Sequence, residues 1–287
     1  MTLEYHAPSS LTAALDYIRQ NNDVHIIAGG TDLLVKHYER LDGLAGLMDL
    51  AKVQELKKVE TGAQVCIGAL VTHQEILQHL WLQAHAPVLC QGAGEVAAFQ
   101  IRHRGTLGGN LANASPAADT APPLVVLGAQ VEIAGPGAKS VPVQDFFTGP
   151  GQTVLTPGQI ITGVRFPAPA ANAGGCYIKL GKRKAMAIAT ASIAVQVTIA
   201  DAKLEDIRIC LGSVAPTPLR ASKTEALLRG QSLNSLALDR AQAQIREEIS
   251  PIDDIRSSAE YRRHTAGVIF LRALRQAILN AGVVQDG

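Results

Sequence analysis

Two short stretches of the sequence decide which fold and ligand to expect: Ile27-Ala28-Gly29-Gly30-Thr31-Asp32 and, much later, Thr106-Leu107-Gly108-Gly109-Asn110. Paired glycines let backbone N–H groups come close to a phosphate, and a threonine hydroxyl adds another donor. Neither stretch matches GxGxxG or GK[ST], which disfavours a Rossmann site and a P-loop. A tight turn explains either stretch alone, whereas the two together suit a long ligand with a central diphosphate.

The residues around the first stretch predict a small α+β unit that ends near residue 55. Ser10 can cap a helix over residues 10–22, because Leu11, Ala14, Leu15 and Ile18 fall on one face. A strand over residues 24–28 runs directly into the two glycines, and residues 47–50 form another strand.

The region around the second stretch has a different pattern. We predict a strand over residues 64–69, a helix capped by Thr72 that continues through Leu80, and a longer helix over residues 88–101. After the glycines, Asp119 could accept hydrogen bonds from ribityl or ribose hydroxyls, or it could cap a helix. Further buried or strand segments are expected at residues 124–127, 131–133, 154–155 and 160–166.

A Pro-, Ala- and Gly-rich segment at residues 167–175 predicts a connection to a C-terminal domain. There, strands over residues 188–199 and 204–211 flank a turn at residues 201–203 and form a hairpin. Helices are predicted over residues 224–229, 236–249 and 260–279. The last helix has one apolar stripe, made of Val268, Leu271, Leu274, Ala277 and Ile278.

Composition excludes several classes of protein. A 47% apolar content argues against general disorder, and a net charge of +1 gives no field for nucleic acid. The four cysteines form no CxxC pair, so an iron–sulfur cluster or structural zinc held by this chain alone is not expected. No apolar run is long enough for a membrane helix and no signal peptide begins the chain, so we expect a cytoplasmic protein.

The order of several short runs resembles the FAD-binding (medium) subunits of the molybdenum hydroxylases, the family of the xanthine dehydrogenases and of the carbon monoxide dehydrogenase flavoprotein. The resemblance covers nearly the whole chain and is specific through the order of its parts. Besides the two glycine stretches and Gln100-Ile101-Arg102, these parts are Ala114-Ser115-Pro116-Ala117-Ala118-Asp119, Phe147-Thr148-Gly149-Pro150-Gly151, Val214-Ala215-Pro216-Thr217-Pro218-Leu219-Arg220 and Glu260-Tyr261-Arg262.

The resemblance implies an α+β fold: a two-subdomain FAD-binding region of the PCMH type (1–55 and 56–170), then a C-terminal domain (176–282) with a small antiparallel sheet and helices. It implies that residues 25–32 and 106–110 surround the FAD diphosphate. It also implies that Asp119 binds the sugar-alcohol part and that Ile161 and Lys179 contact the isoalloxazine region. Taken alone, Ile161 fits a buried strand and Lys179 a solvated surface. The implied FAD ligands are His25, Ile26, Ile27, Ala28, Gly29, Gly30, Thr31, Asp32, Thr106, Leu107, Gly108, Gly109, Asn110, Asp119, Ile161 and Lys179.

The same resemblance implies partners. A [2Fe–2S] small subunit and a molybdenum-cofactor large subunit would form a dimer of heterotrimers with this chain, and FAD would pass electrons to NAD⁺ or another acceptor. No side chain of this chain is then expected to be catalytic. The main rival is a stand-alone FAD-dependent oxidase, but such enzymes usually need a larger substrate domain and a catalytic Tyr, His or Arg constellation, which the sequence does not show. A third function is a scaffold protein that binds FAD without transferring electrons.

Two positions depart from the family pattern. His103 stands where relatives often have Asn, which allows a covalent histidyl–flavin link beside the usual noncovalent binding. Ala187 stands where some relatives carry Asp, in a stretch that resembles the loop near the reactive face of the flavin. The neighbouring run Lys182-Arg183-Lys184 could attract NAD⁺ phosphates or simply be solvated.

Overall fold

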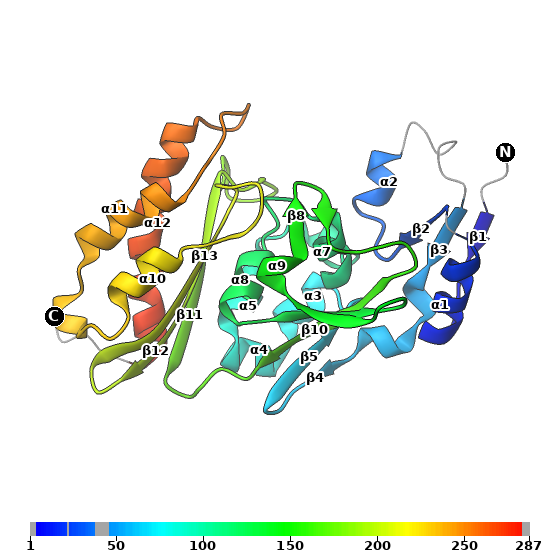
Figure 1. The fold of residues 1–287 in the computed structure, drawn as a ribbon, viewed down its shortest axis with the longest axis horizontal. Coiled ribbons are helices and arrows are strands. Elements are labelled where there is room, and N and C mark those ends of the chain that lie inside the picture. Colours follow the sequence, from blue (N-terminus) through cyan, green and yellow to red (C-terminus); the bar gives the residue numbers. More distant parts are fainter. Residues whose placement is uncertain (1–3, 22, 38–45, 283–287) are drawn as a thin grey trace.

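The computed structural model describes residues 4–21, 23–37 and 46–282. These residues form three larger sheets in consecutive stretches of the chain and a small two-stranded sheet (Figure 1). The first sheet is parallel, with strand order β1-β3-β2. Its strands are β1 (Glu4–His6), β2 (Val24–Ile27) and β3 (Gly46–Asp49), accompanied by helices α1 (Leu11–Gln20) and α2 (Leu33–Lys36).

The predicted first helix and its cap are confirmed. The Ser10 hydroxyl accepts a hydrogen bond from the Ala13 N–H at 3.2 Å, and α1 ends at Gln20. Residue 22, the predicted end, lies outside the described residues. Strand β3 begins one residue before the prediction, and Leu50 already belongs to a 3-10 turn (Leu50–Lys52), which another follows at Gln54–Lys57.

The middle stretch is built on a five-stranded antiparallel sheet with strand order β4-β5-β10-β6-β7. The strands are β4 (Val59–Glu60), β5 (Gln64–Gly68), β6 (Gln130–Ala134), β7 (Lys139–Pro142) and β10 (Ile160–Pro167), with a small hairpin of β8 (Phe147–Gly149) and β9 (Gln152–Thr153). Short helices fill this stretch: α3 (His73–Gln78), α4 (Leu80–His85), α5 (Pro87–Gly94), α6 (Phe99–Arg102), α7 (Leu107–Asn113), α8 (Ala121–Val126) and α9 (Val143–Phe146).

Thr72 caps α3 as predicted, through a reciprocal capping box with Glu75. The helix predicted over residues 88–101 is wrong as one unit, because α5 ends at Gly94 and α6 starts at Phe99. Ala97 adopts a left-handed conformation (φ 42°) that no helix accommodates. The strand predicted at residues 154–155 is also wrong. Strand β9 stops at Thr153, whose hydroxyl accepts a hydrogen bond from the Leu155 N–H at 3.3 Å.

The C-terminal stretch contains an antiparallel four-stranded sheet and three helices, as predicted. Asp201 and Ala202 both have positive φ (49° and 54°), the conformation of a tight hairpin turn. The elements are β11 (Ala173–Leu180), β12 (Ala191–Ala200), β13 (Lys203–Gly212), β14 (Leu219–Arg220), α10 (Ser222–Leu228), a 3-10 turn (Leu233–Ser235), α11 (Leu238–Glu248) and α12 (Ala259–Asn280).

Three predicted boundaries in this half are corrected. The connection predicted over residues 167–175 is shorter, because β10 includes Pro167 and β11 starts at Ala173. Strand β12 starts at Ala191 rather than at residue 188. The apolar stripe of α12 is rotated: Leu274, Ala277 and Ile278 are buried as predicted, whereas Val268 and Leu271 are half-buried at its margin.

The C-terminal sheet is the middle layer between two sets of helices. Helix α12 packs on one face of β11 and β12, while α5 and α8 of the middle stretch pack on the other (Figure 1). Alternate residues of the strands therefore enter different cores: Cys176, Ile193 and Ile209 join the C-terminal core, whereas Tyr177, Ala194 and Cys210 join the core of the middle stretch. This period of two follows from the pleat of a strand.

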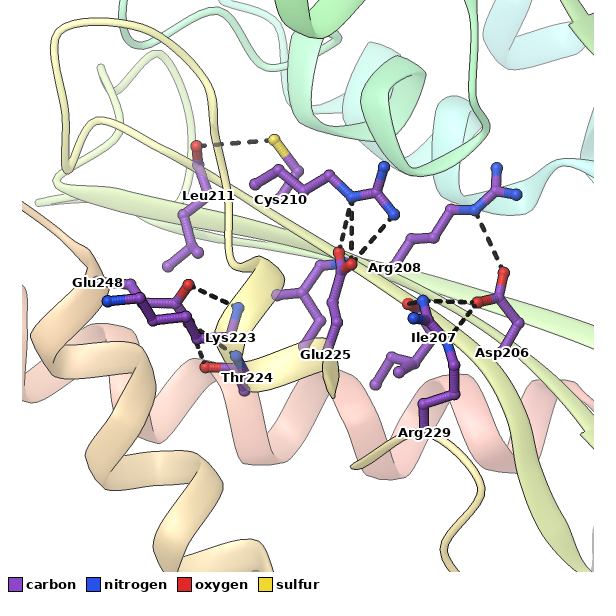
Figure 2. Close-up of polar contacts among 12 residues, drawn as sticks. Asp206, Ile207, Arg208, Cys210, Leu211, Lys223, Thr224, Glu225, Arg229 and Glu248 are labelled. Carbon is purple, nitrogen blue, oxygen red and sulfur yellow. Dashed lines mark hydrogen bonds and ion pairs between the residues drawn. The ribbon is translucent and has the colours of Figure 1, made fainter. Parts of the chain in front are cut away.

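Two acidic residues fix α10 in place (Figure 2): Glu225 is buried and Glu248 is half-buried. Glu225 accepts hydrogen bonds from the Ile209 N–H at 2.8 Å and from the Arg220 guanidinium at 3.0 Å. Glu248 of α11 accepts from the N–H groups of Lys223 and Thr224, both at 2.9 Å, and so caps the start of α10.

No helix within the described parts of the chain is long and apolar enough to cross a membrane.

Candidate cofactor site

A cavity of about 970 Å³ lies where the three stretches meet, at the upper end of the size range of ligand pockets. It is lined at one end by the first glycine loop and at the centre by the second, and the C-terminal stretch lines the other end. A cavity that includes both glycine loops fits an extended ligand better than a compact one.

The first glycine loop has backbone donors that are unpaired as far as the described residues show. The N–H groups of Gly29, Gly30, Thr31 and Asp32 make no hydrogen bond to any described residue, and all four residues line the cavity. Gly30 has φ +74°, a conformation that glycine adopts without strain. Unpaired backbone N–H groups in succession form an anion-binding concavity, so this loop can take a phosphate.

In the second loop, by contrast, hydrogen bonds within the chain occupy the backbone donors. The N–H groups of Leu107 and Gly108 donate to the carbonyls of Val71 (2.9 Å) and Ala69 (2.8 Å). The Gly109 N–H donates to the Thr106 hydroxyl at 3.1 Å, and the Asn110 N–H to the Thr106 carbonyl at 2.9 Å. Any contribution of this loop to a ligand therefore comes from close approach and from side chains.

The two loops touch each other. A Cβ added at Gly29 would stand 1.9 Å from the Arg104 carbonyl oxygen, so only glycine fits there. Farther along α7, the Asn113 amide donates to Asp32 at 3.2 Å and accepts from Lys36 at 2.5 Å. Both loops thus form one continuous wall of the cavity.

Asp119 lies at the centre of a buried polar cluster beside the second loop. Its carboxylate accepts hydrogen bonds from the Tyr177 hydroxyl and from the Lys179 ammonium, each at 2.7 Å, and Lys179 also donates to the Glu95 carbonyl at 2.9 Å. Burial raises the pKa of Asp119 to about 6, although the Lys179 charge acts in the opposite direction. Asp119 does not cap α8, because Thr120 occupies the N-cap position.

Most residues predicted from the sequence lie on the cavity wall. Three do not. His25 is exposed and packs edge-to-face on His37, Leu107 is fully buried, and Lys179 is not in the cavity lining but pairs with Asp119, which is. The predicted residues on the wall are Ile26, Ile27, Ala28, Gly29, Gly30, Thr31, Asp32, Thr106, Gly108, Gly109, Asn110, Asp119 and Ile161.

The structure adds residues to the wall that sequence reasoning did not assign. His73, at the start of α3, is the most deeply buried of the polar ones. At the far end, Arg262 donates to the carbonyls of Thr190 (2.7 Å) and Ser213 (2.8 Å) and pairs with Asp254 at 2.7 Å. The run that contains Arg262 was recognisable in the sequence, but nothing there connected it to the cavity.

The two departures from the family pattern differ in position. Ala187 lines the cavity, next to Met186 and Ile188. His103 is exposed, its Nδ1 lies 2.9 Å from the Phe99 carbonyl oxygen, and it is not in the cavity lining. A covalent link from His103 to a flavin therefore has no support in this geometry.

Two glycine loops on one cavity wall, one of them with backbone donors that have no partner among the described residues, are features of proteins that bind a phosphate-containing cofactor. Comparison with known families is more specific. A model described as FAD binding domain in molybdopterin dehydrogenase matches residues 1–169, and one described as CO dehydrogenase flavoprotein C-terminal domain matches residues 176–277.

Individual relatives cover almost the whole chain. The carbon monoxide dehydrogenase medium chain of Afipia carboxidovorans is 36% identical over 279 residues, which is 96% of each chain. A xanthine dehydrogenase FAD-binding subunit of Escherichia coli O157:H7 is 30% identical over 283 residues, or 97% of each. A chain of reconstituted CO dehydrogenase from Oligotropha carboxidovorans has TM-score 0.92 and 35% identity, covering 98% of this chain and 99% of that one.

The chain belongs to the family of FAD-binding flavoprotein subunits of the molybdenum hydroxylases, the oxidoreductases that include carbon monoxide and xanthine dehydrogenases. The predicted family and α+β fold class are thereby confirmed. Among the residues that the structure describes, no group of three His, Cys, Asp or Glu side chains is placed to hold a metal ion.

Proposed function

We propose that this chain holds FAD along the cavity, with the diphosphate at Gly29–Asp32, as the electron-transfer subunit of a molybdenum hydroxylase. The observation that carries the proposal is the row of four backbone N–H groups without partners among the described residues, on the wall of a cavity of suitable size. Electrons would come from a [2Fe–2S] subunit and leave to NAD⁺ or another acceptor.

FAD suits this place in the chain of electron carriers because its ring accepts electrons singly and gives them up in pairs. The residues of this chain bind FAD and orient it. The donors of the first loop neutralise part of the diphosphate charge, and Asp119 and Asn110 offer acceptors for sugar hydroxyls. Ile161 lies on β10 beside an irregularity in the β10–β6 register, where it is both a core residue and part of the cavity wall.

The same proposal includes the assembly. The chain would join a [2Fe–2S] small subunit and a molybdenum-cofactor large subunit as a dimer of heterotrimers in the cytoplasm, with domains at 1–55, 56–170 and 176–282. Support comes from near-complete coverage of relatives that are themselves medium chains or FAD subunits. That coverage favours a subunit over a stand-alone oxidase.

Acceptor binding by Lys182, Arg183 and Lys184 has weaker support. The Lys182 ammonium donates to the Ile255 carbonyl at 3.0 Å, and the Arg183 guanidinium donates to the Met186 carbonyl at 2.7 Å, so both groups already have partners within the chain. Both groups are exposed, and none of the three side chains lines the cavity where FAD is proposed to bind. The nature of the acceptor is therefore the least supported part of the proposal.

A matched pair of substitutions tests the proposal in the native complex. A Cβ at Gly109 meets the Thr106 hydroxyl at 3.0 Å and no other described atom within 4 Å, so Gly109→Leu extends toward the cavity. We expect it to abolish stoichiometric FAD, seen as loss of the flavin band near about 450 nm, with molybdenum and iron retained.

The control is Gly62→Leu, at an exposed glycine with open space around it. This variant should keep full FAD content. Stoichiometric FAD in the Gly109→Leu protein would contradict the proposed site. A purified native protein without molybdenum- and iron-containing partners would contradict the proposed assembly.

A further inference from the structure

His73 is a buried polar residue of the cavity wall that the function described so far does not use. It is 2% exposed, and its Nδ1 atom is fully enclosed and has no hydrogen-bond partner among the residues that the structure describes. Because Nδ1 is enclosed, a ligand in the cavity can reach this side chain only through its other ring nitrogen. Its other ring nitrogen, Nε2, has no partner among the described residues either, and it is not enclosed.

The imidazole ring lies at the junction of the two glycine loops. The His73 backbone N–H donates to the Gly105 carbonyl at 3.1 Å, which fixes the start of α3 against the second loop. A Cβ placed on Gly105 would be 3.2 Å from His73 Cδ2 and 3.5 Å from the Thr31 hydroxyl. The ring edge that carries Nε2 therefore faces the same small space as the first loop.

The ring is neutral at physiological pH. Burial lowers the pKa of His73 to about 4, and the Arg102 guanidinium adds to this effect. A neutral imidazole has one N–H and one lone pair. Because Nδ1 makes no hydrogen bond within the described part of the chain, the tautomer that carries its proton on Nε2 avoids burying an unpaired N–H. Nε2 then presents a donor to the cavity.

We infer that His73 is an FAD-binding residue whose Nε2–H donates a hydrogen bond to the diphosphate between the two loops. This inference rests on the proposed function, because it needs the diphosphate at the first loop. His73 adds a side-chain donor to the uncharged backbone N–H donors of the first loop. A side chain at Gly105 would crowd the Ile101 carbonyl oxygen (3.1 Å) and the His73 ring (3.2 Å).

One pair of variants tests the inference in the intact complex, with FAD removed and added back. His73→Gln can place an amide N–H where Nε2 stands, whereas His73→Phe keeps the ring shape without a donor. We expect His73→Phe to weaken FAD binding about 10- to 100-fold, the range for a hydrogen bond to a charged group. His73→Gln should bind within a few-fold of the wild type.

Flavin fluorescence titration gives the dissociation constants, and the ³¹P spectrum of bound FAD gives a second readout that is independent of turnover. One diphosphate resonance should shift in His73→Phe and not in His73→Gln. If His73→Phe fails to fold, His73→Asn replaces it, because the Asn amide has the same chemistry but is too short to reach.

The outcomes separate the two hypotheses. Wild-type affinity in His73→Phe, or equal losses in His73→Phe and His73→Gln with an intact fold, would show that His73 only packs. In that case the proposed function stands, because the wild type still binds FAD. Failure of the wild-type complex to bind FAD would instead overturn the proposed function itself.

Discussion

The two glycine loops have similar sequences, yet they differ in what their backbones offer. In the first loop, four successive N–H groups from Gly29 to Asp32 have no partner among the described residues. In the second, the N–H groups from Leu107 to Asn110 all donate within the chain. The cause is local structure: the first loop follows a strand, whereas the second begins helix α7, which Thr106 caps.

This difference shows that paired glycines can serve two purposes. In the first loop, glycine permits a left-handed turn at Gly30 and leaves donors for an anion. In the second, Gly108 allows the start of α7 to lie against Ala69, where a Cβ would stand 2.6 Å from the Ala69 Cβ. The second loop is thus mainly a support that places Asn110 and, farther on, Asp119.

The largest expected effect comes from filling the contact between the loops. Gly29→Ala places a Cβ 1.9 Å from the Arg104 backbone oxygen. We expect the free energy of unfolding to fall by about 3 kcal/mol or more, because the backbone cannot move aside as a side chain can. We also expect the variant to lose FAD. Gly109→Ala should change stability by less than about 1 kcal/mol, since alanine favours the helix. Urea unfolding of both variants measures the difference in stability, and equal losses of stability in the two variants would refute the distinction between the loops.

A smaller effect is expected at Asp119, the charged group that follows the second loop. Its raised pKa means that the folded chain without FAD binds a proton more tightly than the unfolded chain. Between pH 4 and 6 the folded state therefore carries more protons, and stability from this group falls as pH rises, by about 2 kcal/mol in total.

The free energy of unfolding of the wild type minus that of Asp119→Asn, measured without FAD from pH 4 to 7, isolates this effect. The difference should fall up to about pH 6, the value of the raised pKa, and then level off. A difference that rises with pH would mean that the ion pair with Lys179 outweighs burial. Asp119 would then be a fully ionised carboxylate at neutral pH rather than a group that titrates near pH 6.

The smallest effect concerns the cap of α7. Thr106→Val removes the hydroxyl that accepts the Gly109 N–H and should cost about 1 kcal/mol of stability. FAD affinity should fall only slightly, because the diphosphate is proposed to lie on the first loop. Thr106→Ser keeps the hydroxyl and is the control. A loss of FAD in Thr106→Val as large as that in Gly29→Ala would mean that both loops bind the phosphates.

Much of the site could be predicted from the sequence because its signals are local. Glycine pairs, the Ser10 and Thr72 caps and the hairpin near Asp201 all depend on neighbouring residues. The rest depends on partners far away in the chain. Lys179 has a sequence environment typical of a solvated lysine, but its side chain is 5% exposed because Asp119, 60 positions earlier, pairs with it. The left-handed Ala97 likewise has no local signal, since alanine favours helix.

The same dependence on distant residues explains why the sequence alone does not identify His73 as a residue of the site. It follows Thr72 as an ordinary first residue of a helix, and only the tertiary structure places it across from Thr31. The free and occupied donors of the two glycine loops are also invisible in the sequence. Which carbonyls accept from the second loop depends on the packing of α7 against residues 69–71.

The position of the C-terminal sheet as a shared middle layer has a consequence for how the chain can be divided. The two family models meet at residues 169 and 176, which suggests two parts that could be exchanged or separated. Yet Tyr177, Ala194 and Cys210 are buried in the core of the preceding part, on the face opposite to α12. A cut between the parts would expose an apolar sheet face on one piece and helices α5 and α8 on the other. Because each part covers an apolar surface of the other, we expect the two parts to fold together and not as separable domains.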